Sequence, residues 1–296
     1  MVMAFFIDLI TNGLLVGLMY SLVAVGFVLI YKATSIINFA QGDLVMFAGY
    51  AAAVMLGIKG MPIWLMVLIL AGGMIVLGFV LERGILRPMV GQPLVSVIMV
   101  TIGLSFVLQG FVSIIWGGST RELPLPVRMA PYKIGPALIS PINLMAAIIA
   151  VLFLIAFGLF FTRSRLGVAM RAVADDQQAS MVVGIRVSRV FALSWAIAGL
   201  AAAAGGIIWG NMLGVDTLLA LVGLKVFPVV ILGGLDSIGG AIVGGLIMGA
   251  VESVASGYFD PYVGGGTKDF IPYVLMILVL FIKPYGFFGH ETIERV

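Results

Sequence analysis

Long apolar runs divide the chain into segments that are long enough to cross a lipid bilayer. A transmembrane helix needs about 20 mainly apolar residues, and runs of this kind recur along the whole sequence. The candidates are residues 5–31, 36–57, 61–82, 94–116, 142–162, 190–210, 217–234, 240–256 and 270–289. The pattern predicts an all-α polytopic membrane protein with eight or nine membrane segments.

A polar break interrupts the second of these runs, in the stretch "INFAQGDLVMFAGY". It contains Asn38, Gln41, Gly42 and Asp43. Irregular backbone in hydrocarbon survives only beside protein or water, and an ionisable group there usually faces a cavity or a partner. The break therefore predicts the polar lining of a path through the membrane. The alternative is that Asp43 caps a helix at the membrane surface, and both can hold at the mouth of a path.

A second break, Gly233–Gly240, joins two short glycine-rich runs. Its glycines free the backbone, and Asp236 and Ser237 can cap the helix that follows. Glycines after the break recur at a spacing that favours close helix packing: Gly240, Gly244, Gly245 and Gly249. These runs are expected to be full spans, half-helices or re-entrant segments. Glu252 faces either the bundle interior or the external interface, and the sequence does not decide between them.

Composition agrees with lipid as the main solvent. Hydrophobic residues make up 62% of the chain and charged residues 10%, whereas soluble domains carry about 25% charged residues. The absence of cysteine excludes disulfides and thiolate sites, and the lone histidine, His290, is expected to be solvated rather than a metal ligand. The first basic residue is Lys32, so the first run is expected to stay as a span rather than serve as a cleaved signal peptide.

Basic residues in the loops predict the orientation of the chain. The connection 163–189 carries five arginines and the loop 83–93 carries two, so both are expected in the cytoplasm. This places the N-terminus outside and the C-terminus, with Lys283 and Arg295, in the cytoplasm. The predicted external loop 117–141 carries basic residues that run against the rule: Arg121, Arg128 and Lys133. The net charge of +3 is explained by such loops and does not indicate nucleic-acid binding.

The longest polar connection has an internal pattern that is unusual for a loop. Residues 164–185 combine helix-forming residues with the acidic pair Asp175 and Asp176. We predict two short helices, one ending near Ala174 and one starting after Asp175 and stopped by Gly184. Apolar residues form one patch on each helix: Val168, Ala172 and Val173 on the first, and Ala179, Val182 and Val183 on the second. These patches either dock on a partner protein or pack on the membrane face of the same chain.

Four stretches together resemble the permease subunits of ABC importers for branched-chain amino acids, the Liv-type family. They are "NGLLVGLMYSLVAVGFVLIYKATSIINFAQGDLVMFAGY" (12–50), "SRLGVAMRAVADDQQASMVVGI" (164–185), "GLKVFPVVILGGLDSIGGAIVGGLIMGAVES" (223–253) and "IPYVLMILVLFIKPYGFFG" (271–289). They occur in the family's order and cover nearly the whole chain. Asp43 and Asp236 stand where the family commonly has glutamate and glycine, which leaves the solute open among branched-chain amino acids, urea, short amides and other small organic acids.

The resemblance implies a single transmembrane permease domain over residues 1–296, with a cytoplasmic coupling-helix loop at 163–189. It implies a multi-pass protein of the bacterial cytoplasmic (inner) membrane. Its partners would be a homologous second permease subunit, two cytoplasmic ATPase subunits and an external substrate-binding protein. Residues expected at the substrate path or gate are Asn38, Phe39, Gln41, Gly42, Asp43, Gly233, Gly234, Asp236 and Ser237. Residues expected to couple to the ATPases are Arg171, Ala172, Asp175, Asp176, Ala179 and Gly184.

This chain is expected to be the pore-forming subunit and not an enzyme. It has no phosphate-binding loop of the form G-x-x-x-x-G-K-[ST], so ATP and Mg²⁺ would bind to the partner ATPases, and no cofactor is expected in the chain itself. A rival function is an ion-gradient-driven carrier or channel, in which Asp43, Asp236 and Glu252 would form a proton or sodium relay. A membrane-embedded enzyme would need a catalytic cluster, and the sequence offers none beyond His290.

Overall fold

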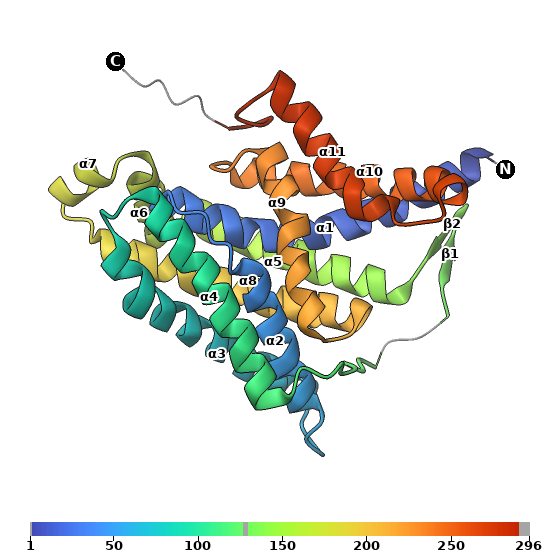
Figure 1. The fold of residues 1–296 in the computed structure, drawn as a ribbon, viewed down its shortest axis with the longest axis horizontal. Coiled ribbons are helices and arrows are strands. Elements are labelled where there is room, and N and C mark those ends of the chain that lie inside the picture. The colour runs from blue at the N-terminus through green and yellow to red at the C-terminus, as the bar shows by residue number, and fades with distance from the viewer. Residues whose placement is uncertain (1, 127–129, 290–296) are drawn as a thin grey trace. The chain divides into compact units, whose positions relative to one another are not determined.

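The computed structural model describes residues 2–126 and 130–289, and most of this part of the chain is helical (Figure 1). Within these ranges, six helical segments are long and apolar enough to cross a membrane. They are α1 (Val2–Thr34), α3 (Ile63–Leu81) with its continuation to Met89, α4 (Leu94–Trp116), α5 (Pro141–Arg163), α8 (Val187–Leu213) and α10 (Ile238–Val263). The predicted polytopic helical class is confirmed. Arg128, His290 and Arg295 lie outside the described residues.

Shorter helical segments account for the remaining apolar runs. They are α2 (Gln41–Leu56), η3 (Thr217–Ala220) followed directly by α9 (Leu221–Gly233), and α11 (Thr267–Ile282). Each predicted run therefore contains a helix. Whether the short helices cross the membrane or re-enter it stays a prediction.

Some helices end at different residues than predicted because neighbouring prolines and glycines decide where a helix stops. α11 ends at Ile282 rather than near residue 289, because Pro284 follows and the residue before a proline is disfavoured in helical conformation. Lys283 is accordingly extended, with φ −135° and ψ 90°. α10 runs past residue 256 to Val263, where Gly264 takes the left-handed conformation (φ 83°) that commonly ends a helix.

The connections contain the remaining regular structure. η1 (Glu82–Leu86) and η2 (Arg87–Met89) continue α3, and α6 (Arg165–Asp175) and α7 (Gln177–Val182) join α5 to α8. In the proline-rich loop 117–141, β1 (Tyr132–Ile134) and β2 (Ala137–Ile139) form an antiparallel hairpin in which Tyr132 pairs with Ile139. The side chain of Asp8 in α1 accepts a hydrogen bond from the Leu138 N–H at 2.7 Å, so β2 is tied to the start of α1.

The chain divides into two compact units. Unit 1 comprises Met1–Val28, Pro126–Val151 and Leu224–Val296, and unit 2 comprises Leu29–Leu125 and Leu152–Gly223. α1, α5 and α9 contribute residues to both units. The single permease domain over residues 1–296 stays a prediction.

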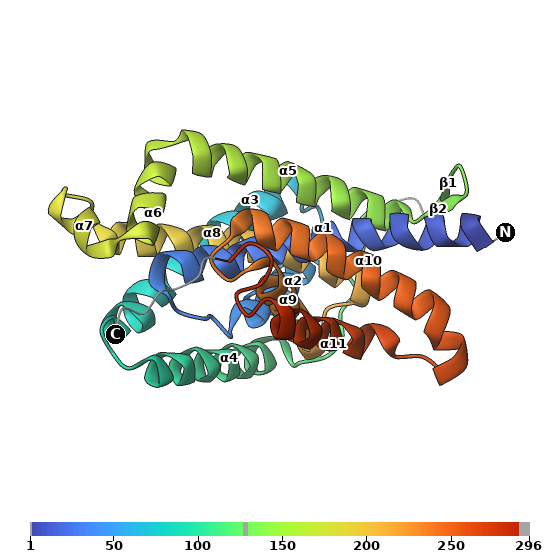
Figure 2. The ribbon, with the colours of Figure 1, turned by 90° about the horizontal axis from the view of Figure 1, so that it is seen from above.

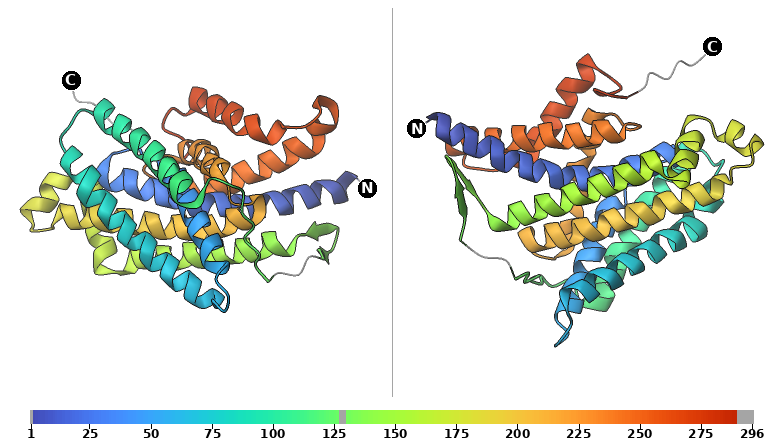
Figure 3. Two further views of the ribbon diagram at one scale, coloured as in Figure 1. Left: turned by 60° about the horizontal axis from the view of Figure 1, so that its bottom comes forward. Right: turned by 180° about the vertical axis from the view of Figure 1, so that it is seen from behind.

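In unit 2, α8 packs against both α2 and α3 (Figure 3). Glycines on α8 permit this close approach because a side chain would meet the facing backbone. A Cβ atom on Gly199 would lie 2.4 Å from the carbonyl oxygen of Met74 in α3, and one on Gly206 would lie 2.6 Å from the amide nitrogen of Gly49 in α2. Most of the apolar side chains of α8 are therefore buried.

In unit 1, α1 and α10 pack through facing glycines. A Cβ atom on Gly249 would lie 2.3 Å from the Gly13 carbonyl oxygen, and one on Gly245 would lie 2.7 Å from the Gly17 carbonyl oxygen. Ser21 of α1 donates a hydrogen bond to the carbonyl oxygen of Ile242 in α10 at 3.0 Å. These contacts confirm the predicted packing role of the glycines that follow the second break.

Replacing Gly249 with alanine is expected to lower the free energy of unfolding by about 1–3 kcal/mol, because the added methyl group overpacks the contact with α1. Gly110→Ala in α4 is the matched control, because nothing lies within 4 Å of a Cβ atom built there and alanine is the better helix former. Thermal unfolding of the purified full chain in detergent measures both. Equal unfolding temperatures for the two variants would contradict the packing role of Gly249.

Candidate functional site

Side-chain hydrogen bonds replace helical ones at the polar break between α1 and α2. The chain turns at Ser35, which has a positive φ of 57°. Asn38 Oδ1 then accepts a hydrogen bond from the Ala40 N–H at 3.1 Å, and Asn38 Nδ2 donates to Gln41 Oε1 at 3.3 Å. Both Asn38 and Gln41 are fully buried, so Asn38 satisfies a buried backbone N–H of the break and is itself paired with Gln41.

Neighbouring helices of unit 2 hold the break in place. Gln41 Nε2 donates a hydrogen bond to the carbonyl oxygen of Ala198 in α8 at 3.3 Å, and Thr101 of α4 donates to the Ile37 carbonyl oxygen at 3.3 Å. Gly42 lies so close to η3 that a Cβ atom would come within 2.1 Å of the Ala220 carbonyl oxygen. The break is thus enclosed by protein, which is the setting in which irregular backbone survives in a membrane. Phe39 beside it is half-buried.

Asp43 is a buried hydrogen-bond acceptor and not a helix cap. Its side chain is 3% exposed and accepts a hydrogen bond from Gln109 Nε2 of α4 at 2.8 Å, while the first turn of α2 has no side-chain cap. Asp43 therefore supplies no side-chain cap to α2, and whether it lies at the mouth of a path or deeper in the membrane stays a prediction. The carboxylate lies in the first turn of α2, where the helix dipole favours negative charge.

The α4 partners of the break were not predicted from the sequence, although a signal exists. Thr101, Ser105 and Gln109 follow one another at intervals of four residues on an otherwise apolar helix. Residues four apart share one helical face, so this polar stripe points to a partner. Gln109 Nε2 also lies 3.4 Å from Ser105 Oγ, which links Asp43 to the stripe.

The second break belongs to unit 1. α9 ends at Gly233, Gly234 has a φ of 104°, and Ser237 Oγ accepts a hydrogen bond from the Gly240 N–H at 3.0 Å. Ser237 is therefore the predicted cap of α10, whereas Asp236 is half-buried and precedes the cap. The backbones at the two ends of the break nearly touch, because a Cβ atom on Gly233 would lie 2.2 Å from the Gly240 carbonyl oxygen.

A charged cluster in unit 1 was also missed. Glu252 of α10 is 7% exposed and accepts a hydrogen bond from the Tyr20 hydroxyl at 3.2 Å. Lys225 Nζ lies 3.9 Å from Glu252 Oε1 and 2.7 Å from Asp269 Oδ1. Glu252 therefore faces the interior and not the external interface. The signal was Lys225, a basic residue inside the apolar run 217–234, since a charge in such a run is usually paired.

The connection between α5 and α8 forms the two predicted short helices. Ser164 Oγ accepts a hydrogen bond from the Gly167 N–H at 2.9 Å and caps α6, and Asp176 Oδ1 accepts one from the Ala179 N–H at 2.9 Å and caps α7. Gly184 then takes a left-handed conformation (φ 85°) that ends the helical segment. Asp175 is the last residue of α6 and is exposed.

The two helices differ in which predicted residues they expose. On α6, Val173 is buried while Val168 is 53% exposed, so the predicted continuous patch is wrong: helical rotation places these valines on different faces. Ala172 beside them is half-buried. Beyond them, Ala179 is exposed, and Val182 and Val183 are 86% and 75% exposed. Figure 2 shows α7 lying beyond the ends of α5 and α8.

Arg171 has a structural contact that the sequence did not indicate. Its guanidinium group donates hydrogen bonds to the carbonyl oxygens of Phe161 and Thr162 at the end of α5, the latter at 3.3 Å. The same group lies 5.4 Å from the Phe161 ring centroid, within the range of a cation–π contact. Arg171 therefore joins α6 to α5.

Asp43→Leu is expected to lower the free energy of unfolding by about 1–3 kcal/mol, because the Gln109 amide loses its charged acceptor in a buried place. Asp43→Asn keeps an acceptor oxygen and is expected to cost less. Denaturant unfolding of the purified chain measures both, and Gln109→Leu added to Asp43→Leu is expected to recover part of the loss. A double variant no more stable than Asp43→Leu would contradict the pairing.

The family described as "Branched-chain amino acid transport system / permease component" matches residues 9–280. The high-affinity branched-chain amino acid transport system permease protein LivH of Escherichia coli (strain K12) is 33% identical, covering 99% of this chain and 98% of the relative. The corresponding protein BraD of Pseudomonas aeruginosa is 32% identical, covering 98% of each.

Among solved structures, a chain of the PsaBC complex from Streptococcus pneumoniae with a bound Fab has a similar fold. Its TM-score is 0.50 at 12% sequence identity, covering 93% of this chain and 92% of that one. At this identity the likeness concerns the fold alone. The resemblance noted in the sequence is confirmed by the family match and by the full-length relatives. The chain belongs to the family of permease components of branched-chain amino acid transport systems.

Proposed function

We propose that this chain is the transmembrane permease subunit of an ABC importer that moves branched-chain amino acids into the cytoplasm. The solute could instead be a related small polar molecule such as urea or an amide, because Asp43 and Asp236 differ from the residues that are common in the family. The observation that carries the proposal is the family match over residues 9–280, together with curated relatives of nearly equal length that are named as branched-chain amino acid permeases.

The proposed topology has eight or nine membrane segments, with the N-terminus outside and the C-terminus inside the bacterial cytoplasmic membrane. The arginines of the connection 163–189 support a cytoplasmic position for α6 and α7. α2 and the segment η3–α9 are too short to be assigned as spans by length. In this proposal they are the broken or re-entrant elements from which transporter paths are commonly built.

The proposed source of energy, ATP hydrolysis, lies in separate subunits. Two cytoplasmic ATPases would bind ATP and Mg²⁺, a homologous second permease would complete the membrane part, and an external binding protein would deliver the solute. α7 supports an ATPase contact because it exposes the apolar residues Met181 and Val182, and the next residue, Val183, is exposed as well. Exposed apolar residues grouped in this way usually mark an interaction surface.

A chain of contacts within unit 2 supports α6 and α7 as coupling helices. Arg171 joins α6 to the end of α5. Gln177 of α7 donates a hydrogen bond to the Ala33 carbonyl oxygen near the end of α1 at 3.2 Å, and the polar break begins five residues later, at Asn38. A displacement of α7 by an ATPase would therefore act directly on the backbone that leads into the break.

The solute would meet complementary groups. A zwitterionic amino acid needs an acceptor for its ammonium group and a donor for its carboxylate, and each unit offers candidates. Unit 2 supplies Asn38, Gln41 and Asp43, and unit 1 supplies Lys225 and Glu252 with opposite charges 3.9 Å apart. The rival, an ion-gradient-driven carrier or channel, would use Asp43, Asp236 and Glu252 as a relay.

In vesicles that contain the assembled transporter, uptake of a branched-chain amino acid is expected to require hydrolysable ATP. Ala179→Glu is expected to lower assembly with the ATPases and uptake at least about tenfold, since about 1.4 kcal/mol of lost docking energy gives that factor. Residue 179 follows the Asp176 cap by three positions, where glutamate favours a helix, so α7 should stay folded. Co-purification and radiolabelled uptake are the measurements.

Lys59→Glu places the same side chain on an exposed loop and is expected to leave assembly and uptake unchanged. Uptake that persists with hydrolysis-deficient ATPases, or after removal of ATP, would favour the rival function. Unchanged assembly of Ala179→Glu would remove α7 from the docking surface.

Gln177→Leu is expected to uncouple solute uptake from ATP hydrolysis. The variant loses one hydrogen bond to Ala33, worth about 1 kcal/mol, so uptake should fall about fivefold while ATP hydrolysis by the assembled complex persists. Gln178→Leu is the matched control, because Gln178 is exposed on the same helix. The ratio of solute moved to ATP hydrolysed is the measurement, and an unchanged ratio for Gln177→Leu would contradict the coupling route.

A further inference from the structure

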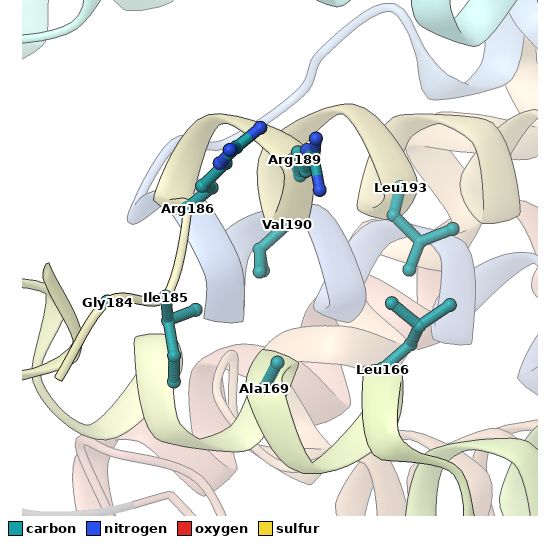
Figure 4. Close-up of a pocket in the computed structure, with 8 residues that line it drawn as sticks. All are labelled: Leu166, Ala169, Gly184, Ile185, Arg186, Arg189, Val190 and Leu193. Carbon is teal, nitrogen blue, oxygen red and sulfur yellow. The ribbon is translucent and has the colours of Figure 1, made fainter.

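Two neighbouring cavities lie along α8 in unit 2, and they are together called the groove. Its first part has a volume of about 290 Å³ and lies between the start of α8 and α6, with Val190, Ala169 and Leu166 among its lining residues (Figure 4). Its second part has a volume of about 270 Å³ and lies between α8 and α5. Leu193 lines both parts, so the two adjoin at this residue and follow one another along α8.

The two ends of the groove differ in chemistry. The first part carries Arg186 and Arg189, whereas the second is lined by apolar residues alone, with Phe153, Phe157 and Phe160 of α5 facing Ile197 and Leu200 of α8. In Figure 4 the apolar side chains of Leu166, Val190 and Leu193 point into the gap between α6 and α8, while the side chains of Arg186 and Arg189 extend from the side of α8 that faces away from α6. The groove is therefore amphipathic along its length.

The spacing along α8 matches one leaflet of a bilayer. Arg189, Leu193, Ile197 and Leu200 follow at intervals of four, four and three residues, which places them on one helical face. At 1.5 Å per residue, Arg189 to Leu200 spans about 16 Å. Half of a hydrocarbon core of about 30 Å is about 15 Å, so arginines at a membrane surface would put Leu200 near the bilayer midplane.

Arg186 and Arg189 are suited to bind an anion. Arg186 and Arg189 are both exposed, and neither forms an ion pair within the part of the chain that the structure describes. They also stand at the N-terminal end of α8, where the helix dipole disfavours positive charge. A phosphate group bound to both would offset the repulsion between the two arginines and the unfavourable helix dipole. It would also accept charge-assisted hydrogen bonds from the guanidinium groups.

We propose that this groove binds one anionic phospholipid, with its phosphate on Arg186 and Arg189 and an acyl chain between α5 and α8. The occupant needs a negative head and an apolar tail that reaches about half the bilayer. A free phosphate ion would leave the phenylalanine-lined part empty, and an amino acid is too short to reach it. The bound lipid would fill the space that separates α5 and α6 from α8. It would thereby fix the distance between these helices and the position of α7, which follows α6. The proposal requires only that the chain lies in a membrane, not that it carries a particular solute.

The test uses the full chain purified in mild detergent and analysed by native mass spectrometry with added phosphatidylglycerol or phosphatidylcholine. Wild type is expected to retain one phosphatidylglycerol in preference to phosphatidylcholine. Arg186→Gln/Arg189→Gln is expected to weaken phosphatidylglycerol binding about 30-fold, since each basic residue contributes roughly a factor of five toward an anionic lipid. Ile197→Trp keeps both arginines but fills the apolar part, and should also expel the lipid.

Lys59→Gln/Arg83→Gln removes the same charge from exposed positions outside the groove and is expected to bind phosphatidylglycerol as wild type does. Equal weakening in this control, or unchanged binding in both groove variants, would overturn the proposal. Displacement of the lipid by inorganic phosphate at equal concentration would show that the apolar part contributes nothing, and would also overturn it. If the arginine variant loses assembly with the ATPases but keeps its lipid, the anion belongs to a partner protein and the proposal is wrong.

Discussion

The structure depends on one constraint: a chain that lies in lipid must satisfy its backbone polar groups from within the protein. The stretch between α1 and α2 meets this constraint with side chains. Asn38 bonds the backbone that follows it, Gln41 reaches the Ala198 carbonyl oxygen, and Thr101 reaches the Ile37 carbonyl oxygen. Because one of these bonds lies within the break and the others connect it to α8 and α4, the break stays irregular yet enclosed. An irregular but supported backbone of this kind is compatible with the proposed place of the break on a transport path.

The lipid environment also constrains how the helices pack. Where lipid surrounds a bundle, the hydrophobic effect does not drive helices together, and close van der Waals contact must do so. The glycines of α8 and α10 provide it, at Gly199 and Gly206 in unit 2 and at Gly245 and Gly249 in unit 1. α5 offers no such surface to α8. Phenylalanines line its side of the gap, where the proposed lipid chain would lie.

In the proposed function, α6 and α7 could act on the transport path only through contacts that join them to it. Here the joint is local: Gln177 of α7 bonds the end of α1, and Arg171 of α6 bonds the end of α5. Neither contact uses a conspicuous residue pattern. Both long side chains reach backbone carbonyl oxygens at helix ends, which lack partners within their own helix, and in the proposed function these helix ends would receive the movement of the ATPases.

The sequence alone determined the class of the protein, the order of its helical segments, the two breaks and the two short helices before α8. These features follow from local patterns: the length of apolar runs, a glycine or proline that stops a helix, and a serine or aspartate that caps one. The helix ends were less certain, as at Ile282, where the proline two positions later ended α11 early.

Tertiary structure alone decided which side chains meet. Asp43 could have been a cap until α4 placed Gln109 beside it, and Glu252 could have faced outward until Lys225 and Tyr20 were found beside it. Val173 turned inward while Val168 stayed exposed. The physical reason is that each of these partners lies dozens of residues away or on a particular helical face. Local patterns specify the need for a partner, but only the packing of helices determines which partner is within reach.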